Sequence, residues 1–196
     1  MIAIVKYNAG NVFSVNCALQ RLGVQAVVTD DPSTLRAAHK VIFPGVGEAS
    51  TAMSYLREKG LDKVIAGLKQ PVLGICIGMQ LMCRHSEEGD VDCLGIFDVP
   101  VVRFNPADKN LKVPQVGWNQ ISDFGDCPLY KNVTAGDYVY YVHSYHVPVC
   151  EWTIAKTDYS GLYSASLHKD NFWATQFHPE KSGSVGEQII ANFLAL

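Results

Sequence analysis

One cysteine stands between two glycines behind a short apolar run, in "PVLGICIGMQLM" (71–82). The run predicts a strand and the residues from Met79 onward a helix, so Cys76 falls at the sharp corner between them. Small residues on both sides let neighbouring backbone pack closely, which accounts for Gly74 and Gly78. A thiol at the start of a helix is favoured as the thiolate and is then nucleophilic. The alternative is a small buried apolar residue, with glycines that merely end a strand.

A second segment with suitable chemistry is "QFHPEKSG" (176–183). His178 and Glu180 are one residue apart, so an extended chain projects both from the same face, and Pro179 keeps His178 extended. A carboxylate beside an imidazole fixes its tautomer and stabilises the imidazolium, which leaves the other ring nitrogen to face a thiol. Taken alone, the pair also fits an exposed histidine and a solvated glutamate. Together with Cys76 it forms a set of nucleophile, base and orienting group.

A third loop, "FPGVGEAS" (43–50), carries two glycines that allow unusual peptide orientations. A backbone N–H in this loop could join the N–H of Ile77 in binding a developing oxyanion. The alternative is an ordinary turn between strand and helix. The loop is no P-loop, because no Gly-Lys-Ser/Thr follows it.

The first half of the chain alternates between two kinds of pattern. Apolar runs with strand character occupy 2–5, 25–29, 40–43 and 71–76. Helical spacing occupies 12–22, 49–59 and the residues from Met79. This alternation predicts βαβ units and a mostly parallel sheet flanked by helices on both faces. Ligands of such sheets lie beyond the carboxyl ends of the strands, which is where Cys76 falls.

The second half is less regular. Residues 92–145 predict shorter strands that form an antiparallel extension. A strand at 172–178 is followed by a helix that Ser184 and Glu187 would open with a capping box. We see no linker or repeat and predict one α/β domain over residues 1–196.

Composition excludes several classes of protein. The chain has 196 residues, a net charge of −3 and six cysteines. The charge gives no footprint for nucleic acid, and without a Cys-x-x-Cys pair we expect no metal site. No apolar stretch approaches the roughly 18 residues of a membrane span, and no signal peptide is evident. We expect a cytoplasmic protein with no cofactor, bound to neither membrane nor nucleic acid.

The three loops in this order, "PGVG", "GICIGMQ" and "QFHPE", resemble those of the class I, triad-type glutamine amidotransferases. "YNAGN" (7–11), "QVGWNQI" (115–121) and "YYVHSY" (140–145) extend the resemblance to the glutaminase subunits of imidazole glycerol phosphate synthase. The likeness covers essentially the whole chain. It implies a flavodoxin-like amidotransferase fold.

The resemblance also implies roles for individual residues. Cys76 would attack the side-chain amide of glutamine, His178 would move the proton and Glu180 would orient His178. Ile77 and, after a peptide rearrangement, Val46 or Gly47 would hold the oxyanion with their N–H groups. Residues matched to glutamine binding are Gly45, Gln80, His143, Ser144 and Tyr145. Gln80 has the alternative of a helix-surface amide, and His143 that of an ordinary strand end.

By the same resemblance, ammonia would pass to a (β/α)8 synthase subunit that makes imidazole glycerol phosphate and aminoimidazole carboxamide ribotide. A barrel needs about 250 residues, so this partner would be a separate chain in a heterodimer. Residues matched to the docking face are Asn11, Trp118, Asn119, Tyr138, Tyr140 and Lys181. Each could equally be a packed edge residue. The rival functions are a subunit of another amidotransferase, a free-standing γ-glutamyl hydrolase and a non-catalytic scaffold.

Overall fold

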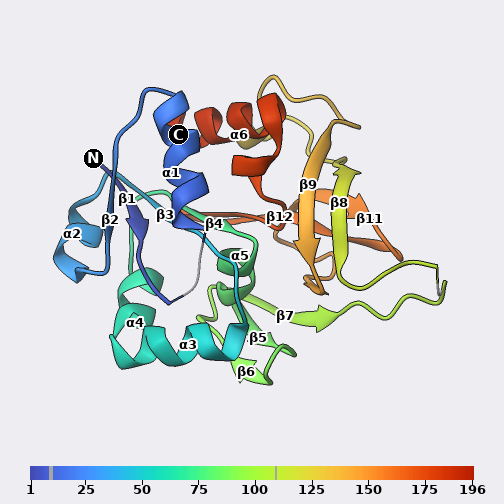
Figure 1. The fold of residues 1–196 in the computed structure, drawn as a ribbon, viewed down its shortest axis with the longest axis horizontal. Coiled ribbons are helices and arrows are strands. Elements are labelled where there is room, and N and C mark those ends of the chain that lie inside the picture. Colours follow the sequence, from blue (N-terminus) through green and yellow to red (C-terminus); the bar gives the residue numbers. More distant parts are fainter. Residues whose placement is uncertain (9–10, 109) are drawn as a thin grey trace.

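A seven-stranded sheet forms the centre of the molecule (Figure 1). The structure is a computed structural model that describes residues 1–8, 11–108 and 110–196. Two residues of the "YNAGN" segment, Ala9 and Gly10, lie outside the described residues. In the order of the sheet, the strands are β11 (Thr153–Asp158), β12 (Leu162–Lys169), β13 (Phe172–Thr175), β4 (Val72–Ile75), β3 (Lys40–Phe43), β1 (Ile2–Val5) and β2 (Ala26–Thr29). All neighbouring pairs from β13 to β2 are parallel, as predicted.

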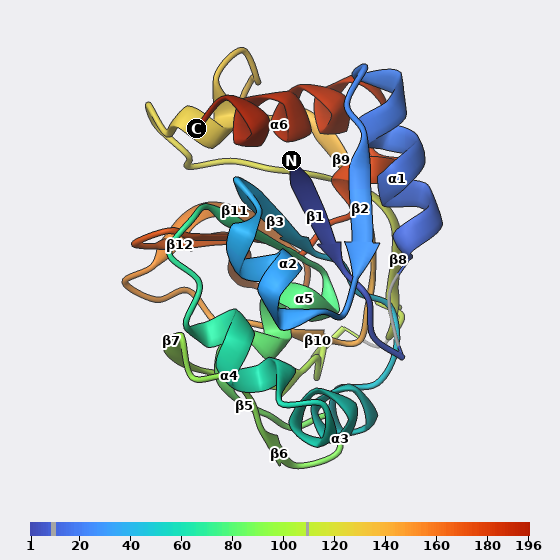
Figure 2. The same ribbon diagram turned by 90° about the vertical axis from the view of Figure 1, so that its left-hand side faces the viewer.

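Helices cover both faces of this sheet (Figure 2). One face packs against α1 (Val12–Arg21) and α6 (Gly183–Ala195). The other packs against α2 (Pro32–Ala37), α3 (Ala49–Glu58), α4 (Leu61–Ala66) and α5 (Ile77–Leu81). Neighbouring strand residues alternate between the two cores, for example Ile42 toward α1 and Val41 toward α3. A parallel sheet buried on both faces needs such continuously apolar strands.

Residues 92–145 form short, largely antiparallel strands, as predicted, but the prediction that they extend the central sheet is wrong. The antiparallel extension of that sheet is formed by β11 and β12, in which β11 pairs with β12 and β12 pairs with β13. The physical reason is proximity in the chain, since a tight turn places β12 beside β11 and a second turn leads directly into β13. The middle residues form two separate small sheets. These contain β10 (Tyr145–His146), β7 (Phe97–Arg103), β5 (Cys83–Ser86) and β6 (Val91–Asp92) in one, and β8 (Gln115–Gln120) with β9 (Tyr138–His143) in the other.

The predicted capping box of the last helix is also wrong. The N-cap of α6 is Ser182, and the helix begins before Ser184. Glu187 forms an ion pair with Arg21 of α1 instead. The Ser182 hydroxyl donates to the carbonyl of His178 at 2.6 Å and accepts from the amide of Tyr140 at 2.9 Å. The start of α6 therefore holds the histidine segment against β9.

Within residues 1–8, 11–108 and 110–196, none of the helices has both the length and the apolar character that crossing a membrane requires.

Candidate active site

The corner predicted at Cys76 is present between β4 and α5. Cys76 has φ 52° and ψ −108°, a backbone conformation that non-glycine residues rarely adopt and that costs about 1–3 kcal/mol. Its amide donates to the carbonyl of Thr175 at 2.7 Å. A Cβ on Gly78 would collide with the carbonyl of Phe43, and one on Gly74 would lie 2.9 Å from the sulfur of Met82. The two glycines thus let the corner pack closely on β3 and on the segment after α5.

His178 and Glu180 are brought together, but not by an extended chain. His178 itself has an extended backbone, as predicted, but residues Pro179–Lys181 form the 3-10 turn η2, so the prediction that an extended chain projects both side chains from one face is wrong. Proline is tolerated in the first turn of a helix, where its missing N–H has no partner to lose. The turn brings the Glu180 carboxylate within 2.8 Å of His178 Nδ1. Both side chains are buried, at 0% and 1% exposure.

The environment of His178 favours its protonated form. Burial lowers the pKa of His178, but the Cys76 sulfur and the Glu180 carboxylate outweigh this effect, so the pKa is raised to about 10. Nε2 is buried and has no hydrogen-bond partner among the described residues. Nδ1 is engaged by the carboxylate, so Nε2 is the ring nitrogen left available for proton transfer.

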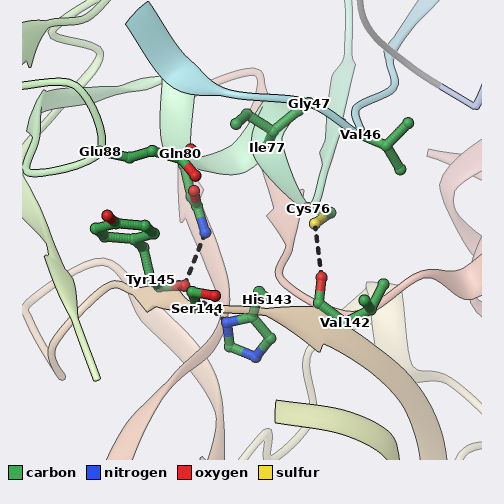
Figure 3. Close-up of a pocket in the computed structure, with 10 residues that line it drawn as sticks. All are labelled: Val46, Gly47, Cys76, Ile77, Gln80, Glu88, Val142, His143, Ser144 and Tyr145. Carbon is green, nitrogen blue, oxygen red and sulfur yellow. Dashed lines mark hydrogen bonds between the residues drawn. The ribbon is translucent and has the colours of Figure 1, made fainter. Parts of the chain in front are cut away.

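A cavity of about 210 Å³ opens at the Cys76 corner (Figure 3). It suits a ligand smaller than the drug-sized molecules that fill cavities of about 300–1,000 Å³. The lining residues are Val46, Gly47, Cys76, Ile77, Gln80, Glu88, Val142, His143, Ser144 and Tyr145. Eight of these ten were predicted site residues. His178 and Glu180 are fully or almost fully buried and do not line the cavity.

The loop predicted to supply oxyanion donors reaches this cavity. Val46 is 39% exposed, and Gly47 has φ 136°, a conformation that glycine adopts without strain. Beside this loop, α5 begins at Ile77, and no side chain caps this helix start (Figure 3). The N–H of Ile77 is one of the first-turn donors that an α-helix leaves without an internal partner. Gly45 is packed against the Ile77 side chain and does not line the cavity.

Gln80 faces the cavity rather than solvent, with 3% exposure. Its Nε2 donates to the carbonyl of Tyr145 at 2.8 Å and to Oε1 of Gln176 at 2.9 Å. Both amide hydrogens are thus engaged within the protein. The Oε1 of Gln80 is left as an acceptor for a ligand.

His143 lines the cavity with a ring whose nitrogens face protein partners. Nδ1 lies 2.7 Å from the carbonyl of Tyr145, and Nε2 lies 3.3 Å from the hydroxyl of Tyr163. Burial lowers the pKa of His143 to about 3, so the ring is neutral and Nδ1 carries the hydrogen. The side chain therefore holds the Tyr145 carbonyl in place, which is closer to the strand-end alternative than to a ligand contact.

Glu88 is a lining residue that the sequence analysis missed. Its Oε2 accepts from the amide of Ala49 at 3.0 Å, and its side chain lies beside that of Gln80 (Figure 3). Burial raises the pKa of Glu88, and nearby Glu48 raises it further. It is the only carboxylate among the ten lining residues. Nothing in its "SEEG" context separates it from an ordinary surface loop, so no sequence signal marked it.

The residues predicted for partner docking divide into two groups. Trp118 on β8 and Tyr138 on β9 are 55% and 53% exposed, and the Trp118 ring meets Tyr140 edge-on at 6.0 Å. Lys181 Nζ lies 5.9 Å from the centre of the Tyr140 ring. The other two side chains have partners inside the chain. Asn11 caps α1 by accepting from the amide of Ser14, and Asn119 donates to the carbonyl of Asp158.

No group of three histidine, cysteine, aspartate or glutamate side chains within the described ranges is placed to hold a metal ion. The cavity chemistry rests on the buried thiol, the imidazole–carboxylate pair and backbone donors. Such a set can carry out nucleophilic attack on an amide with proton transfer to the leaving group.

Comparison with known proteins defines the class. The family model described as "Glutamine amidotransferase class-I" matches residues 5–196. A putative GMP synthase subunit from Thermoplasma acidophilum shares the fold with a TM-score of 0.76 at 20% identity, over 100% of this chain and 92% of that one. The glutaminase domain of Trypanosoma brucei CTPS, solved with bound acivicin, has a TM-score of 0.67 at 18% identity, over 99% and 93% of the two chains. Fold and family model together define a class-I glutamine amidotransferase.

Relatives with higher sequence identity show to which family within this class the chain belongs. The imidazole glycerol phosphate synthase subunit HisH of Bacteroides fragilis (strain YCH46) is 63% identical over 100% of this chain and 99% of the relative. The HisH subunit of Pectobacterium atrosepticum is 44% identical over the same shares of the two chains. The chain therefore belongs to the HisH family of imidazole glycerol phosphate synthase subunits.

Proposed function

We propose that this chain is the glutaminase subunit of imidazole glycerol phosphate synthase and hydrolyses glutamine through Cys76, His178 and Glu180. The observation that carries the proposal is the strained Cys76 corner at the cavity, with the buried His178–Glu180 pair behind it. The Cys76 thiolate attacks the side-chain amide carbon. His178 gives its proton to the departing nitrogen, so the C–N bond breaks and ammonia leaves a glutamyl thioester. Water then hydrolyses the thioester, which releases glutamate and restores the thiol.

Backbone donors stabilise the negative charge that develops on the amide oxygen. Ile77 supplies one N–H at the start of α5, and Val46 or Gly47 supplies the second from the loop beside it. A missing oxyanion donor costs about 10²–10³ in rate. The loop from 44 to 47 can therefore switch the reaction by turning a single peptide.

The remaining polar groups bind the α-carbon end of glutamine. Glu88 supplies the negative charge that an α-ammonium group requires, and Oε1 of Gln80 supplies an acceptor beside it. The backbone of Ser144 and Tyr145 forms one wall of the cavity. His143 and Gln80 fix this wall by donating hydrogen bonds to the Tyr145 carbonyl. Glutamine is thereby anchored with its amide toward Cys76.

Replacing Glu88 with glutamine should raise KM for glutamine about 10–100-fold and leave kcat within a few-fold, because a charge-assisted hydrogen bond to substrate is lost. In the unaltered protein, KM should rise as the pH falls through the elevated pKa of Glu88, since protonation removes the same charge. Steady-state glutaminase kinetics across pH measure both effects. Glu87→Gln is the matched control, because this neighbour accepts from the amide of Arg103 instead of lining the cavity. Equal KM values for the two variants would contradict the assignment.

We further propose that ammonia passes to a (β/α)8 synthase subunit docked on the outer face of the β8–β9 ribbon. On this ribbon, inward residues such as Tyr141 are fully buried, while Val116, Trp118 and Tyr138 are more than half exposed. The main chain of β9 also reaches the nucleophile, since the carbonyl of Val142 lies 3.9 Å from the Cys76 sulfur. A partner seated on the aromatic face would therefore lie beside the point of ammonia release.

Trp118→Ala should weaken binding to the synthase partner about 10–100-fold, because an exposed aromatic that anchors an interface carries a large share of the binding energy. Titration calorimetry with the purified partner measures the Kd. Val27→Ala is the control, since Val27 is also 43% exposed but lies on β2, at the opposite edge of the central sheet. The docking proposal fails if both variants bind the partner with the same Kd.

The experiment that tests the function compares glutamine hydrolysis by the isolated chain with hydrolysis in the presence of the synthase partner and its nucleotide ligand. We expect weak hydrolysis alone and a stimulation of about 10²-fold or more, the size of one oxyanion donor gained. Full activity without a partner would instead favour a free-standing γ-glutamyl hydrolase. We place the protein in the cytoplasm as one domain without a cofactor, in keeping with six free thiols among the described residues.

A further inference from the structure

A buried amide that the mechanism above does not use stands between the nucleophile and Gln80. Gln176 follows β13 directly, is fully buried, and donates its backbone N–H to the carbonyl of Ala165 at 2.8 Å. Its Nε2 lies 3.7 Å from the sulfur of Cys76, and its Oε1 accepts from Nε2 of Gln80 at 2.9 Å. The side-chain amide thus has one end on the reacting atom and the other on a residue of the cavity wall.

The hydrogen-bond network fixes which end of Gln176 faces the sulfur. The carbonyl of Tyr145, 2.8 Å from the Gln80 amide, can only accept, so the NH₂ group of Gln80 points toward Tyr145 and Gln176. The atom of Gln176 that meets this NH₂ group must then be its oxygen. The NH₂ group of Gln176 is therefore directed at the Cys76 sulfur.

Besides His178, the sulfur has two hydrogen-bond neighbours with opposite preferences. The carbonyl of Val142, at 3.9 Å, can only accept a hydrogen and so favours the thiol. The NH₂ group of Gln176 can only donate and so favours the thiolate. Hydrogen bonds to an ionised partner are roughly twice as strong as those between neutral groups, and burial strengthens them further. Two titratable groups are coupled to the sulfur: His178, which favours the thiolate, and the buried Tyr7, whose pKa is raised so that it stays neutral. In this setting, the balance between the Val142 and Gln176 contacts shifts how readily the thiolate forms.

We propose that Gln176 is a further catalytic residue, which donates a hydrogen bond to the Cys76 thiolate and connects it through Gln80 to the glutamine-binding wall. The assignment rests on the proposed function, in which Cys76 is the nucleophile. A glutamine seated against Gln80 and Tyr145 then also aligns the donor at the sulfur. The alternative is that Gln176 only satisfies the Gln80 amide and has no effect on the sulfur.

The two hypotheses predict different pH dependences for the alkylation of Cys76. Iodoacetamide modification of the folded chain is followed by mass spectrometry of the peptide that contains Cys76, so the other five cysteines do not interfere. In Gln176→Leu, the pH of half-maximal alkylation should rise by about one unit, because a charge-assisted donor is lost. In Gln176→Glu it should rise further, because a carboxylate oxygen replaces the donor in a side chain of the same size.

Asn192→Leu is the matched control. Asn192 is another buried amide, in α6, and its Nδ2 donates to the carbonyls of Leu129 and Lys131, away from the sulfur. This variant should lower the unfolding temperature yet keep the alkylation profile of the unaltered chain. Circular dichroism verifies the fold of each variant, and if Gln176→Leu does not fold, the isosteric Gln176→Glu decides.

Profiles of the Gln176 variants that superimpose on that of the unaltered chain would overturn the proposal, as would an equal shift in Asn192→Leu. In the complex, we also expect Gln176→Leu to reduce kcat for glutamine about tenfold and to leave the rate with ammonium salt unchanged. The alkylation readout needs no turnover. Absence of glutaminase activity in the unaltered complex would therefore refute the proposed function without removing a shift caused by Gln176.

Discussion

Cys76→Ala should abolish glutamine-dependent synthesis by the complex, with a loss of about 10⁴-fold or more, because no other group replaces the nucleophile. The same variant should retain synthesis from added ammonium salt, since the partner's reaction requires only ammonia. Alanine keeps the Cβ and places no new atom at the corner between β4 and α5. Initial rates with glutamine and with ammonium salt, measured on one preparation of complex, give both numbers.

Cys127→Ala is the control for this experiment. Cys127 is another free, partly buried cysteine, and it lies in the segment before η1 (Pro128–Tyr130), outside the cavity. Its replacement should leave both rates within about two-fold, as is usual for substitutions away from special sites. If Cys76→Ala keeps its glutamine-dependent rate, the nucleophile is wrongly assigned. Loss of both rates would show that the corner supports the complex rather than the chemistry.

The nucleophile corner and the parallel sheet were predictable because local sequence determines them. Four-residue apolar runs predict strands buried on both faces, and β3 and β4 lie where those runs stand. The corner at Cys76 needs glycine at 74 and 78 for reasons of contact distance. These requirements show in the residue types themselves. The same holds for Gly23, which ends the pattern of α1 with φ 73°.

Features that depend on distant partners were not predictable in this way. The pairing of β12 with β13 and the hydrogen bonds of the Ser182 hydroxyl to His178 and Tyr140 depend on which segments meet in space. Glu88 is an ordinary acidic residue by sequence, and only the packing of its loop beside α3 turns it toward Gln80. The role proposed for Gln176 likewise depends on its contacts with Gln80 and Cys76, which lie about a hundred residues earlier in the chain. Periodicity reports which face is buried, but not which hydrogen bonds form there.

Glu180→Gln should lower kcat for glutamine about 10²–10⁴-fold while leaving KM little changed. The variant keeps the size of the side chain and an oxygen for His178 Nδ1, but it removes the negative charge 2.8 Å from the ring. In serine proteases the matching change of the orienting carboxylate costs about 10⁴. KM should stay nearly unchanged because Glu180 does not line the cavity. The matched control is Glu187→Gln, which makes the same change in a surface ion pair with Arg21 and should keep kcat.

The pH dependence of kcat gives this prediction its sharpest test. His178 must be protonated to give its proton to the departing ammonia, and Cys76 and Glu180 together raise its pKa to about 10. Removing the Glu180 charge leaves burial, which lowers the pKa, opposed by the sulfur alone. The His178 proton is then lost at lower pH, so the alkaline limb of the kcat profile should move toward neutrality in Glu180→Gln. An alkaline limb that stays in place, with kcat within about three-fold of the unaltered complex, would show that the buried carboxylate supports the fold and not proton transfer.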